Sequence, residues 1–444
     1  MPKPLESRSS SHASRRHFLK TSSLLVAGGA VAGQLNIARA AHSYGSDTIK
    51  IGLIGCGGRG TGAAAQAMNT KGEVKLIAVG DAFEDNVKSC LRGLSGQYGP
   101  KLDVPPERQF WGLDNFQKVL ETDLDLVILA TPPGFRPQHF EAAVKAGKHV
   151  FMEKPVAVDA AGVRRVLAAN DEARSKGLAV AVGLQRRHEP QYIETIQRLQ
   201  DGAIGDILLT RAYWNGGGVW VRPRQPQQTE MEYQMRNWYY FNWLCGDHIV
   251  EQHIHNLDVI NWLKNAYPVS AQGQGGREVR RGKDHGQIYD HFFIEYTYAD
   301  GSKMFSQCRH IPNTWSSVSE FAHGTKGTSN ISASQINGLD GKSIWRFGRG
   351  GAGGHQQEHH DLFAKLRAGE TPNEGDYGAL STMTAILGRM AAYSGQMIGW
   401  DDALKSELVI SPTDQYTGFN DTPPVVPDGN GGYPIPVPGV AKVV

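Results

Sequence analysis

The chain has 444 residues, of which 40% are hydrophobic and 20% are charged, and its formal net charge is +2. This length suits two domains rather than one, and the nearly balanced charge argues against a nucleic-acid partner. Four cysteines are too few for a disulfide-stabilised scaffold, so we expect no disulfide framework.

The first 40 residues contain the three parts of an export signal. The twin-arginine sequence RRHFLK at 15–20 precedes an apolar stretch at 24–32, and ARA at 38–40 offers the small residues that a signal peptidase reads. We therefore interpret residues 1–40 as a twin-arginine signal peptide. This predicts recognition by the twin-arginine export machinery and a location in the periplasm or another extracytoplasmic compartment. No later stretch approaches the ~20 apolar residues of a spanning helix, so we expect no stable membrane anchor.

From residue 48 the chain alternates short apolar strands with helices. The predicted strands are 50–54, 74–79, 124–130, 149–152 and 178–184, and the predicted helices are 61–69, 85–94, 114–120, 137–146 and 159–175. Apolar strands separated by helices are typical of a parallel sheet that is covered on both faces. We therefore predict a dinucleotide-binding Rossmann domain over residues 48–185.

The pattern changes after about residue 190, where the strands lengthen or alternate in polarity. The predicted elements are strands at 286–298 and 303–309 and helices at 246–263, 356–368 and 378–393. We expect a substrate and oligomerisation domain over residues 186–400, an α/β domain with a mixed, mainly antiparallel open sheet. Residues 401–444 form a tail rich in proline and glycine, which is expected to extend over the surface.

The sequence GCGGRG at 55–60 matches G-x-G-x-x-G, follows a predicted strand and opens a helix. Such glycines allow a tight turn close to a pyrophosphate, and the helix N-terminus offers free N–H groups to its charge. Asp81 ends the second strand, with the spacing of the acid that holds the adenosine ribose. Its carboxylate would repel a 2′-phosphate, which favours NAD over NADP and leaves NADP possible. The predicted cofactor-binding residues here are Gly55, Gly57, Gly58, Arg59, Gly60 and Asp81.

Further motifs accompany this loop: TPP at 131–133, AGKHV at 146–150 and EKP at 153–155. Together they resemble the Gfo/Idh/MocA oxidoreductase family, from about residue 48 to 400. The resemblance implies a Rossmann domain, a second α/β domain, hydride transfer at a sugar or cyclitol carbon, and homo-oligomers packed through the open sheet. It adds Thr131, Pro132, His139, Glu153 and Lys154 to the cofactor-binding residues.

The second motif of the family resembles G-G-x-x-x-D-x-G-x-H-x-x-D and is matched with residues 246–258. His255 takes the position of the catalytic histidine, Glu251 stands where aspartate is usual, and His253 stands where glycine is usual. These departures bear on the shape of the substrate pocket.

The predicted catalytic residues are Lys154, Glu251 and His255. A neutral imidazole can accept the proton of an alcohol near neutral pH. Glu251 and His255 are four residues apart on one predicted helix, so the carboxylate is expected to touch the ring and fix its tautomer. Lys154 follows a strand at its C-terminal end, where α/β sheets bind ligands, and its ammonium can polarise the substrate oxygen or relay the proton. Without the resemblance, a surface lysine and a core histidine are the more ordinary interpretations.

Residues 213–243 are dense in Tyr, Trp, Arg and Asn. Aromatic faces stack on sugar C–H groups, and amide and guanidinium groups bind hydroxyls. An oligomer interface has the same composition, and this alternative stays open. The predicted substrate-binding residues are Arg187, Tyr213, Trp238, Asn242 and His253. Acidic and histidine side chains at 247–255 resemble metal ligands, but no zinc-binding spacing is present, so no metal is predicted.

The sequence thus predicts an exported, NAD(P)-dependent oxidoreductase. It would transfer a hydride between a sugar, glycoside or cyclitol hydroxyl and a tightly held nicotinamide cofactor. Tight binding is expected because an extracytoplasmic compartment lacks a free NAD pool, whereas folded export carries a bound cofactor. The alternative is an NAD-dependent glycoside hydrolase or lyase that uses the same residues with no net redox change.

Overall fold

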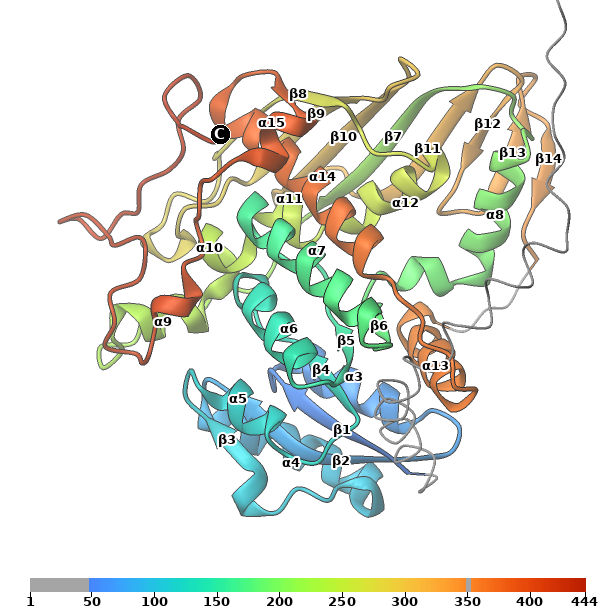
Figure 1. Ribbon diagram of the computed structural model, residues 1–444. Coiled ribbons are helices and arrows are strands. Elements are labelled where there is room, and N and C mark those ends of the chain that lie inside the picture. Colours follow the sequence, from blue (N-terminus) through green and yellow to red (C-terminus); the bar gives the residue numbers. More distant parts are fainter. Residues whose placement is uncertain (1–47, 349–352) are drawn as a thin grey trace, which may run out of the picture. The chain divides into compact units, whose positions relative to one another are not determined.

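Two sheets organise the chain, as the computed structural model shows (Figure 1). The structure describes residues 48–348 and 353–444. The predicted export signal at 1–40 lies outside these described residues. None of the helices within the described ranges combines the length and the apolar character of a membrane-spanning segment.

The first sheet has six parallel strands in the order β3-β2-β1-β4-β5-β6. Its strands are β1 (Thr48–Ile54), β2 (Glu73–Asp81), β3 (Gln109–Trp111), β4 (Leu126–Leu129), β5 (His149–Met152) and β6 (Val180–Val182). The connecting helices are α3 (Gly58–Met68), α4 (Glu84–Tyr98), α5 (Asn115–Leu120), α6 (Arg136–Lys145) and α7 (Ala160–Ser175). The strand order reverses between β1 and β4, and dinucleotides bind in the crevice at such a switch point. The predicted Rossmann fold is confirmed, although the sequence analysis missed the three-residue strand β3.

The second sheet has nine strands in the order β14-β13-β12-β11-β7-β10-β9-β8-β15. They are β7 (Ile207–Gly216), β8 (Ser270–Gly276), β9 (His291–Thr297), β10 (Lys303–His310), β11 (Ser317–Gly324), β12 (Gly327–Asn330), β13 (Gln335–Gly338), β14 (Ser343–Arg346) and β15 (Ile398–Gly399). Only β7 and β10 pair in parallel, so the predicted mixed, mainly antiparallel sheet is confirmed. The division predicted at residue 185 falls between the last strand of the first sheet and the first strand of the second.

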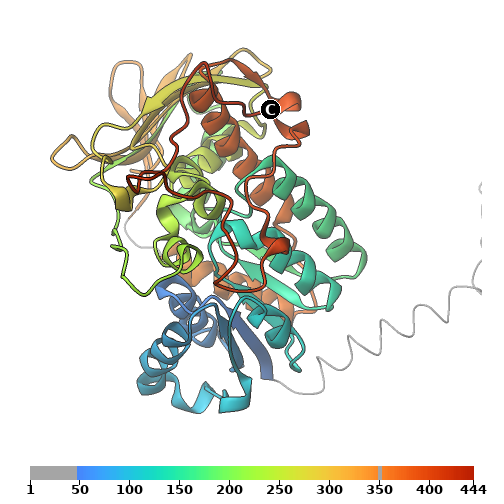
Figure 2. The same ribbon diagram turned by 90° about the vertical axis from the view of Figure 1, so that its left-hand side faces the viewer.

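Helices cover one face of the second sheet and also join it to the first. They are α8 (Pro190–Gln200), α9 (Glu230–Arg236), α10 (Asn242–Cys245), α11 (His248–Glu251), α12 (Ile254–Lys264), α13 (Gly354–Arg367), α14 (Gly375–Ser394) and α15 (Trp400–Lys405). α14 packs on β8 and β9 and also on α7, while α13 packs on α3. Alternate side chains on the other face of the sheet stay exposed, as Phe293 and Val318 show. Beyond Lys405 the tail runs along the molecule with no further strand or α-helix (Figure 2).

The prediction of one helix over 246–263 is wrong, because the helix is interrupted between α11 and α12. The interruption lies at Gln252 and His253, whose side chains form hydrogen bonds with residues of β10. Gln252 Oε1 lies 2.8 Å from His310 Nε2, and His253 Nε2 lies 2.7 Å from Ser306 Oγ. These contacts tie the two residues between α11 and α12 to the second sheet.

A histidine in the core of α13 makes stability sensitive to acid. The His359 ring is fully buried against Phe151, with ring centroids 4.2 Å apart, and neither ring nitrogen has a hydrogen-bond partner among the described residues. Burial lowers the pKa of His359 from 6.5 to about 3. Its contribution to stability is therefore complete above pH 6.5 and is lost as the pH falls from 6.5 toward 3, because the unfolded chain binds the proton first.

We expect His359→Phe to remove this part of the acid sensitivity. At about pH 5 the wild-type ring should lower the free energy of unfolding by about 2 kcal/mol relative to about pH 8. Thermal unfolding of both proteins across this range measures the difference, which should shrink in the variant. An unchanged pH dependence would contradict a neutral, buried His359.

Candidate active site and nucleotide cleft

The glycine loop between β1 and α3 has the shape that a dinucleotide requires. Gly55 has φ +100°, and a Cβ there would lie 2.5 Å from the carbonyl carbon of Ala130. A Cβ on Gly60 would lie 1.9 Å from Gly55 O, so both positions require glycine for packing. At Gly57 and Gly58 a Cβ would meet nothing within 4 Å. This open space lies at the N-terminus of α3, where free N–H groups suit a pyrophosphate.

A cavity of about 760 Å³ lies over this loop. Of the predicted cofactor-binding residues, it is lined by Gly55, Gly57, Gly58, Arg59, Asp81, Thr131, Pro132 and His139. Gly60 is buried beneath the loop, and Glu153 and Lys154 lie at the end of β5, outside this lining. The residues present therefore fit a nicotinamide dinucleotide.

Asp81 holds the loop and also faces the cleft. Its Oδ2 accepts a 2.7 Å hydrogen bond from Cys56 N, and its Oδ1 accepts from Phe83 N at 2.9 Å and from Asn86 Nδ2 at 3.0 Å. Burial raises the pKa of this carboxyl, and these three donors oppose the shift. A carboxylate fixed here accepts hydrogen bonds from ribose hydroxyls and repels a phosphate.

His139, which lines the cleft, carries no charge at neutral pH. The His139 ring stacks on Phe116 with centroids 4.4 Å apart, and its Nδ1 lies 3.2 Å from Thr131 Oγ1. Burial, together with the nearby charge of Arg136, lowers the pKa of His139 to about 3. His139 therefore shapes the site as a neutral ring.

Glu153 connects the glycine loop to α13. Its Oε1 lies 3.0 Å from Arg59 Nε. On its other side lies Glu358 of α13, which is buried and whose pKa is raised well above 4.5, first by burial and then by the charge of Glu153. A neutral Glu358 next to Glu153 avoids two buried like charges. The sequence analysis missed Glu358, since no motif marks α13.

Lys154 and Glu251 meet at the end of β5. Lys154 Nζ donates to the backbone oxygen of Glu251 at 2.6 Å and lies 3.2 Å from Glu251 Oε1. Both side chains are 12% exposed, so the pair is largely shielded from water. A lysine ammonium has three N–H donors, and these two contacts leave one for a substrate oxygen.

His255 lies close to this pair in a neutral state. Its ring is 8% exposed and stacks on Trp214 with centroids 6.0 Å apart, and its Nδ1 has no hydrogen-bond partner among the described residues. Burial lowers the pKa of His255 well below 6.5, and the positive charge of Lys154 lowers it further. The structure therefore brings Lys154 and His255 within electrostatic reach of each other.

The predicted contact between Glu251 and His255 is wrong. Glu251 ends α11 and His255 belongs to α12, so the two residues do not share a helix face. The Glu251 carboxylate binds Lys154 instead. Glu251 thus orients the lysine and makes no hydrogen bond to His255 in the described part of the chain.

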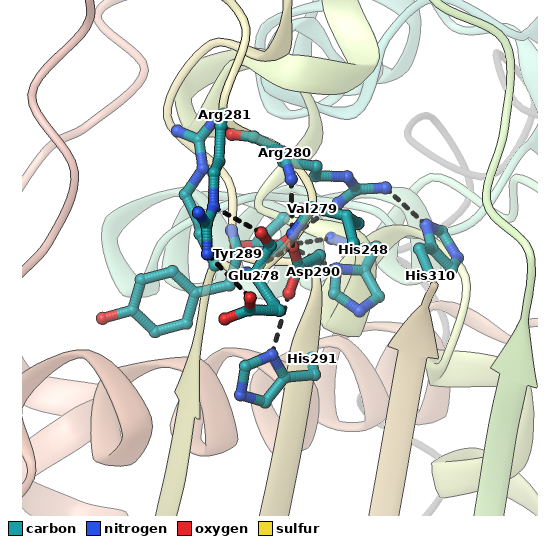
Figure 3. Close-up of polar contacts among 11 residues, drawn as sticks. His248, Glu278, Val279, Arg280, Arg281, Tyr289, Asp290, His291 and His310 are labelled. Atoms are coloured by element: carbon teal, nitrogen blue, oxygen red, sulfur yellow. Dashed lines mark hydrogen bonds and ion pairs between the residues drawn. The ribbon is translucent and has the colours of Figure 1, made fainter. Parts of the chain in front are cut away.

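A buried polar network supports the break between these helices (Figure 3). Asp290 Oδ2 accepts backbone N–H groups of residues 278–280 at 2.6–3.1 Å, and its Oδ1 lies 2.8 Å from His291 Nδ1. The loop held in this way places Arg280 Nη2 2.6 Å from His310 Nδ1. Because arginine only donates, His310 Nδ1 accepts and its Nε2–H donates to Gln252 Oε1 at 2.8 Å. This chain of hydrogen bonds fixes the side chain of Gln252, the residue directly after Glu251.

Of the predicted substrate-binding residues, Trp238 lines the nucleotide cavity. Tyr213 neighbours Trp214 on β7 and points to the other face of the sheet, since side chains alternate along a strand. There the Tyr213 hydroxyl accepts from Arg211 Nη1 at 3.3 Å, and its ring contacts Trp315. Tyr213 is therefore directed away from His255.

The other three predicted substrate-binding residues have structural partners. Arg187 binds both carboxylate oxygens of Asp258, with contacts of 2.8 to 3.2 Å. Asn242 accepts from the Tyr393 hydroxyl at 3.0 Å and lines a separate cavity beneath the tail. His253 is fully buried on Ser306. None of the three lines the nucleotide cavity.

Tyr239 is a candidate that the sequence analysis did not single out. Its side chain is buried, and its hydroxyl has no hydrogen-bond partner in the described part of the chain. Burial raises the pKa of Tyr239 well above 10, and the charge of Glu251 raises it further. Tyr239 lies in an aromatic-rich stretch, and no local pattern indicates which ring of that stretch approaches Glu251.

These features together define an oxidoreductase that depends on a nicotinamide dinucleotide. They are the Rossmann sheet, the open glycine loop, Asp81 and the arrangement of Lys154 and His255. Residues 49–184 match the model of an oxidoreductase family with an NAD-binding Rossmann fold, Gfo/Idh/MocA. This stretch of the chain is thus similar to the NAD-binding domain of that family, and its cofactor is NAD(H).

Relatives and solved structures agree with this assignment. The chain is 25% identical to an inositol 2-dehydrogenase of Rhizobium meliloti over 281 residues, which are 63% of this chain and 74% of the relative. A scyllo-inositol dehydrogenase of Lactobacillus casei with bound NAD(H) and scyllo-inositol superposes with TM-score 0.61 at 20% identity, covering 80% of this chain and 99% of that one.

An aldose-aldose oxidoreductase of Caulobacter crescentus superposes with TM-score 0.61 at 18% identity, covering 79% of this chain and 99% of that one. At these identities the two solved structures show the shared fold.

Proposed function

We propose that the enzyme transfers a hydride between NAD and a secondary hydroxyl of a sugar, glycoside or cyclitol. The observation that carries this proposal is the site at the end of β5. There the Lys154 ammonium is held by Glu251, and a neutral His255 lies within its electrostatic reach. The Nδ1 of this ring has no hydrogen-bond partner among the described residues. An ammonium donor and a neutral imidazole base are the two groups that oxidation of an alcohol requires.

NAD, when bound across the glycine loop, supplies the hydride acceptor. The remaining N–H donor of Lys154 would bind the hydroxyl oxygen and stabilise the negative charge that develops on it. The unpartnered Nδ1 of His255 would accept the hydroxyl proton. Burial keeps this ring neutral before the reaction, and Glu251 keeps Lys154 aimed at the substrate.

The substrate class is supported by similarity and by the lining of the cleft. The relatives and neighbours bear the names of inositol dehydrogenases and of an aldose-aldose oxidoreductase. Trp238 lines the cleft with an aromatic ring, and such rings stack on the C–H face of a sugar ring.

We propose further that the protein is exported through its twin-arginine signal and works with a retained cofactor. A retained NAD must be regenerated in place by a second substrate, which makes the reaction an exchange between two carbohydrates. The exposed side chains Phe293 and Val318 on the open sheet face support assembly into a homo-oligomer.

One preparation tests these statements together. The protein should be recovered from the extracytoplasmic fraction, purified without added nucleotide and passed over a gel-filtration column. We expect NAD to co-elute in close to one equivalent per chain, in a peak larger than a monomer. Denaturation releases the nucleotide for identification, and NADP in its place would contradict the predicted specificity.

The loaded protein is then mixed with single sugars and cyclitols. Hydride transfer predicts that a true substrate produces at most one equivalent of bound NADH, seen by its near-ultraviolet absorbance, which a second sugar then removes. Cleavage of a glycosidic bond without a net change in the cofactor would instead support the hydrolase or lyase alternative. A protein that neither carries nor binds NAD would contradict both.

A further inference from the structure

The nucleotide cavity has walls from two parts of the chain. The glycine loop, Asp81 and α4 contribute one wall, and the segment around α9 contributes the other. The residues from this segment that line the cavity are Trp220, Arg222, Met235, Arg236 and Trp238. A dinucleotide bound in this cavity would therefore lie between two walls, and the wall around α9 would lie across its exit.

Arg236 connects the two walls. Its Nη1 and Nη2 each lie 3.1 Å from a carboxylate oxygen of Asp85 on α4. Its guanidinium carbon lies 3.9 Å from the centre of the Phe83 ring, two residues after Asp81. The hydrogen bonds from Arg236, together with its charge, lower the pKa of Asp85, so the pair stays ionised at neutral pH. This bridge spans the cavity where Asp81 places the adenosine ribose.

The tail holds α9 against the Rossmann sheet. The Phe419 ring stacks on Phe83 with centroids 5.1 Å apart, and its carbonyl accepts from Thr229 Oγ1 at 2.5 Å. Gln234 Nε2 donates to the carbonyl of Val425 at 2.7 Å. Residues almost 200 positions away in the sequence therefore fix both ends of α9, and Figure 1 shows α9 beside the red tail.

Arg222 supplies an unused positive charge to the same cavity. Within residues 48–348 and 353–444, no carboxylate lies at ion-pair distance from its guanidinium, which lies 5.0 Å from the centre of the Trp220 ring. Arg59, which belongs to the glycine loop, is paired with Glu153. Arg222 is thus the cation of the second wall that is available to an anionic cofactor.

We infer that these residues form a gate over the adenosine half of NAD, closed by the Arg236–Asp85 bridge and by Phe419 on Phe83, with Arg222 facing the pyrophosphate. We call α9 with residues 219–222 and 416–425 the adenosine gate. It rests on the proposed function, since it explains how an exported enzyme keeps its cofactor. NAD leaves only when the bridge breaks and α9 moves together with the tail.

The test measures cofactor release from the intact protein, apart from turnover. Asp85→Asn removes the bridge with little change in volume, Arg236→Gln removes it together with the guanidinium on Phe83, and Arg198→Gln is the matched control. Arg198 also pairs with a carboxylate, Glu194, and also lies over an aromatic ring, that of Trp345, but it does not line the cavity. Release of bound NADH is followed by the loss of its tryptophan-sensitised fluorescence after dilution into excess NAD.

Arg236→Gln should release NADH about five- to tenfold faster than wild type, the size expected for a bidentate ion pair combined with a cation–π contact. Asp85→Asn keeps the cation–π contact and should release NADH about two- to fivefold faster. The double variant should be no faster than the faster single one, because both remove the same bridge. Arg198→Gln should release NADH at the wild-type rate, and equal unfolding temperatures show that the variants are folded.

Phe419→Ala provides a second measurement that does not depend on the ion pair, and it should also accelerate release. Wild-type release rates in the bridge variants and in Phe419→Ala would overturn the gate and leave the proposed function standing. Failure of the wild-type protein to bind NAD at all would instead overturn the proposed function.

Discussion

Replacing Lys154 with methionine should lower kcat by about 10³-fold while NAD stays bound. Methionine keeps most of the length of the side chain and removes the ammonium, so the loss reports the charge and its donor. The large effect is expected because the site is shielded from water, with Lys154 and Glu251 each 12% exposed. No second ammonium or guanidinium contacts Glu251 in the described part of the chain.

Two further variants show whether the activity depends on the position of the Lys154 ammonium or on the charge of its partner Glu251. Glu251→Gln keeps an oxygen for Lys154 and removes the negative charge, so we expect a smaller loss, about tenfold to a hundredfold. Lys176→Met is the matched control, because Lys176 Nζ also binds a backbone oxygen, that of Val144, at 3.0 Å and a carboxylate, that of Glu172, at 2.7 Å. Lys176 lies on the surface, and its variant should turn over normally.

Single-turnover reduction of bound NAD, with nucleotide content measured on the same samples, separates chemistry from binding. A Lys154→Met protein that reduces its cofactor at a near-normal rate would remove Lys154 from the mechanism. A variant that has lost NAD would assign Lys154 to cofactor binding instead.

Replacing His255 with alanine should lower the rate of the chemical step by about 10²- to 10⁴-fold. The buried ring accepts the proton in its neutral form, and its Nδ1 has no competing partner among the described residues. Because the variant leaves a space next to Trp214, added imidazole should restore part of the activity. A merely structural role for His255 predicts no rescue.

The pH dependence of the reaction follows from the direction of the pKa shift. Burial and the charges of Lys154 and Arg186 hold the pKa of His255 well below 6.5. A base must be neutral to act, so the rate of the wild-type enzyme should stay level as the pH falls through 6.5 and should decline only at lower pH. In His255→Ala this acid limb should disappear. A wild-type rate that halves near pH 6.5 would contradict a buried, neutral base.

Much of the first domain could be predicted from local sequence. Apolar strands, intervening helices and the glycine loop each depend on residues close together in the chain, and βαβ units connect them in one way only. Asp81 and Lys154 were placed by the same logic, since both lie at strand ends on the edge where a parallel sheet binds ligands. The cofactor cleft was therefore evident from the sequence.

The substrate side of the site was not evident, because its geometry depends on contacts between distant residues. Gln252 and His253 bind β10, so the predicted single helix is interrupted and Glu251 turns from His255 to Lys154. Asn242 faces a cavity whose walls come largely from the tail. No local pattern encodes such pairings.

The sequence by itself determined the Rossmann fold and the nucleotide loop, because periodicity and motif spacing act over a few residues. Lys154 and His255 were predicted as catalytic residues only through the resemblance to a known family. Only the tertiary structure decided which partner Glu251 has, which face Tyr213 occupies and how α9 and the tail close the cleft. These features arise where segments separated by tens to hundreds of residues pack together, and a single break in a helix is enough to redirect a side chain.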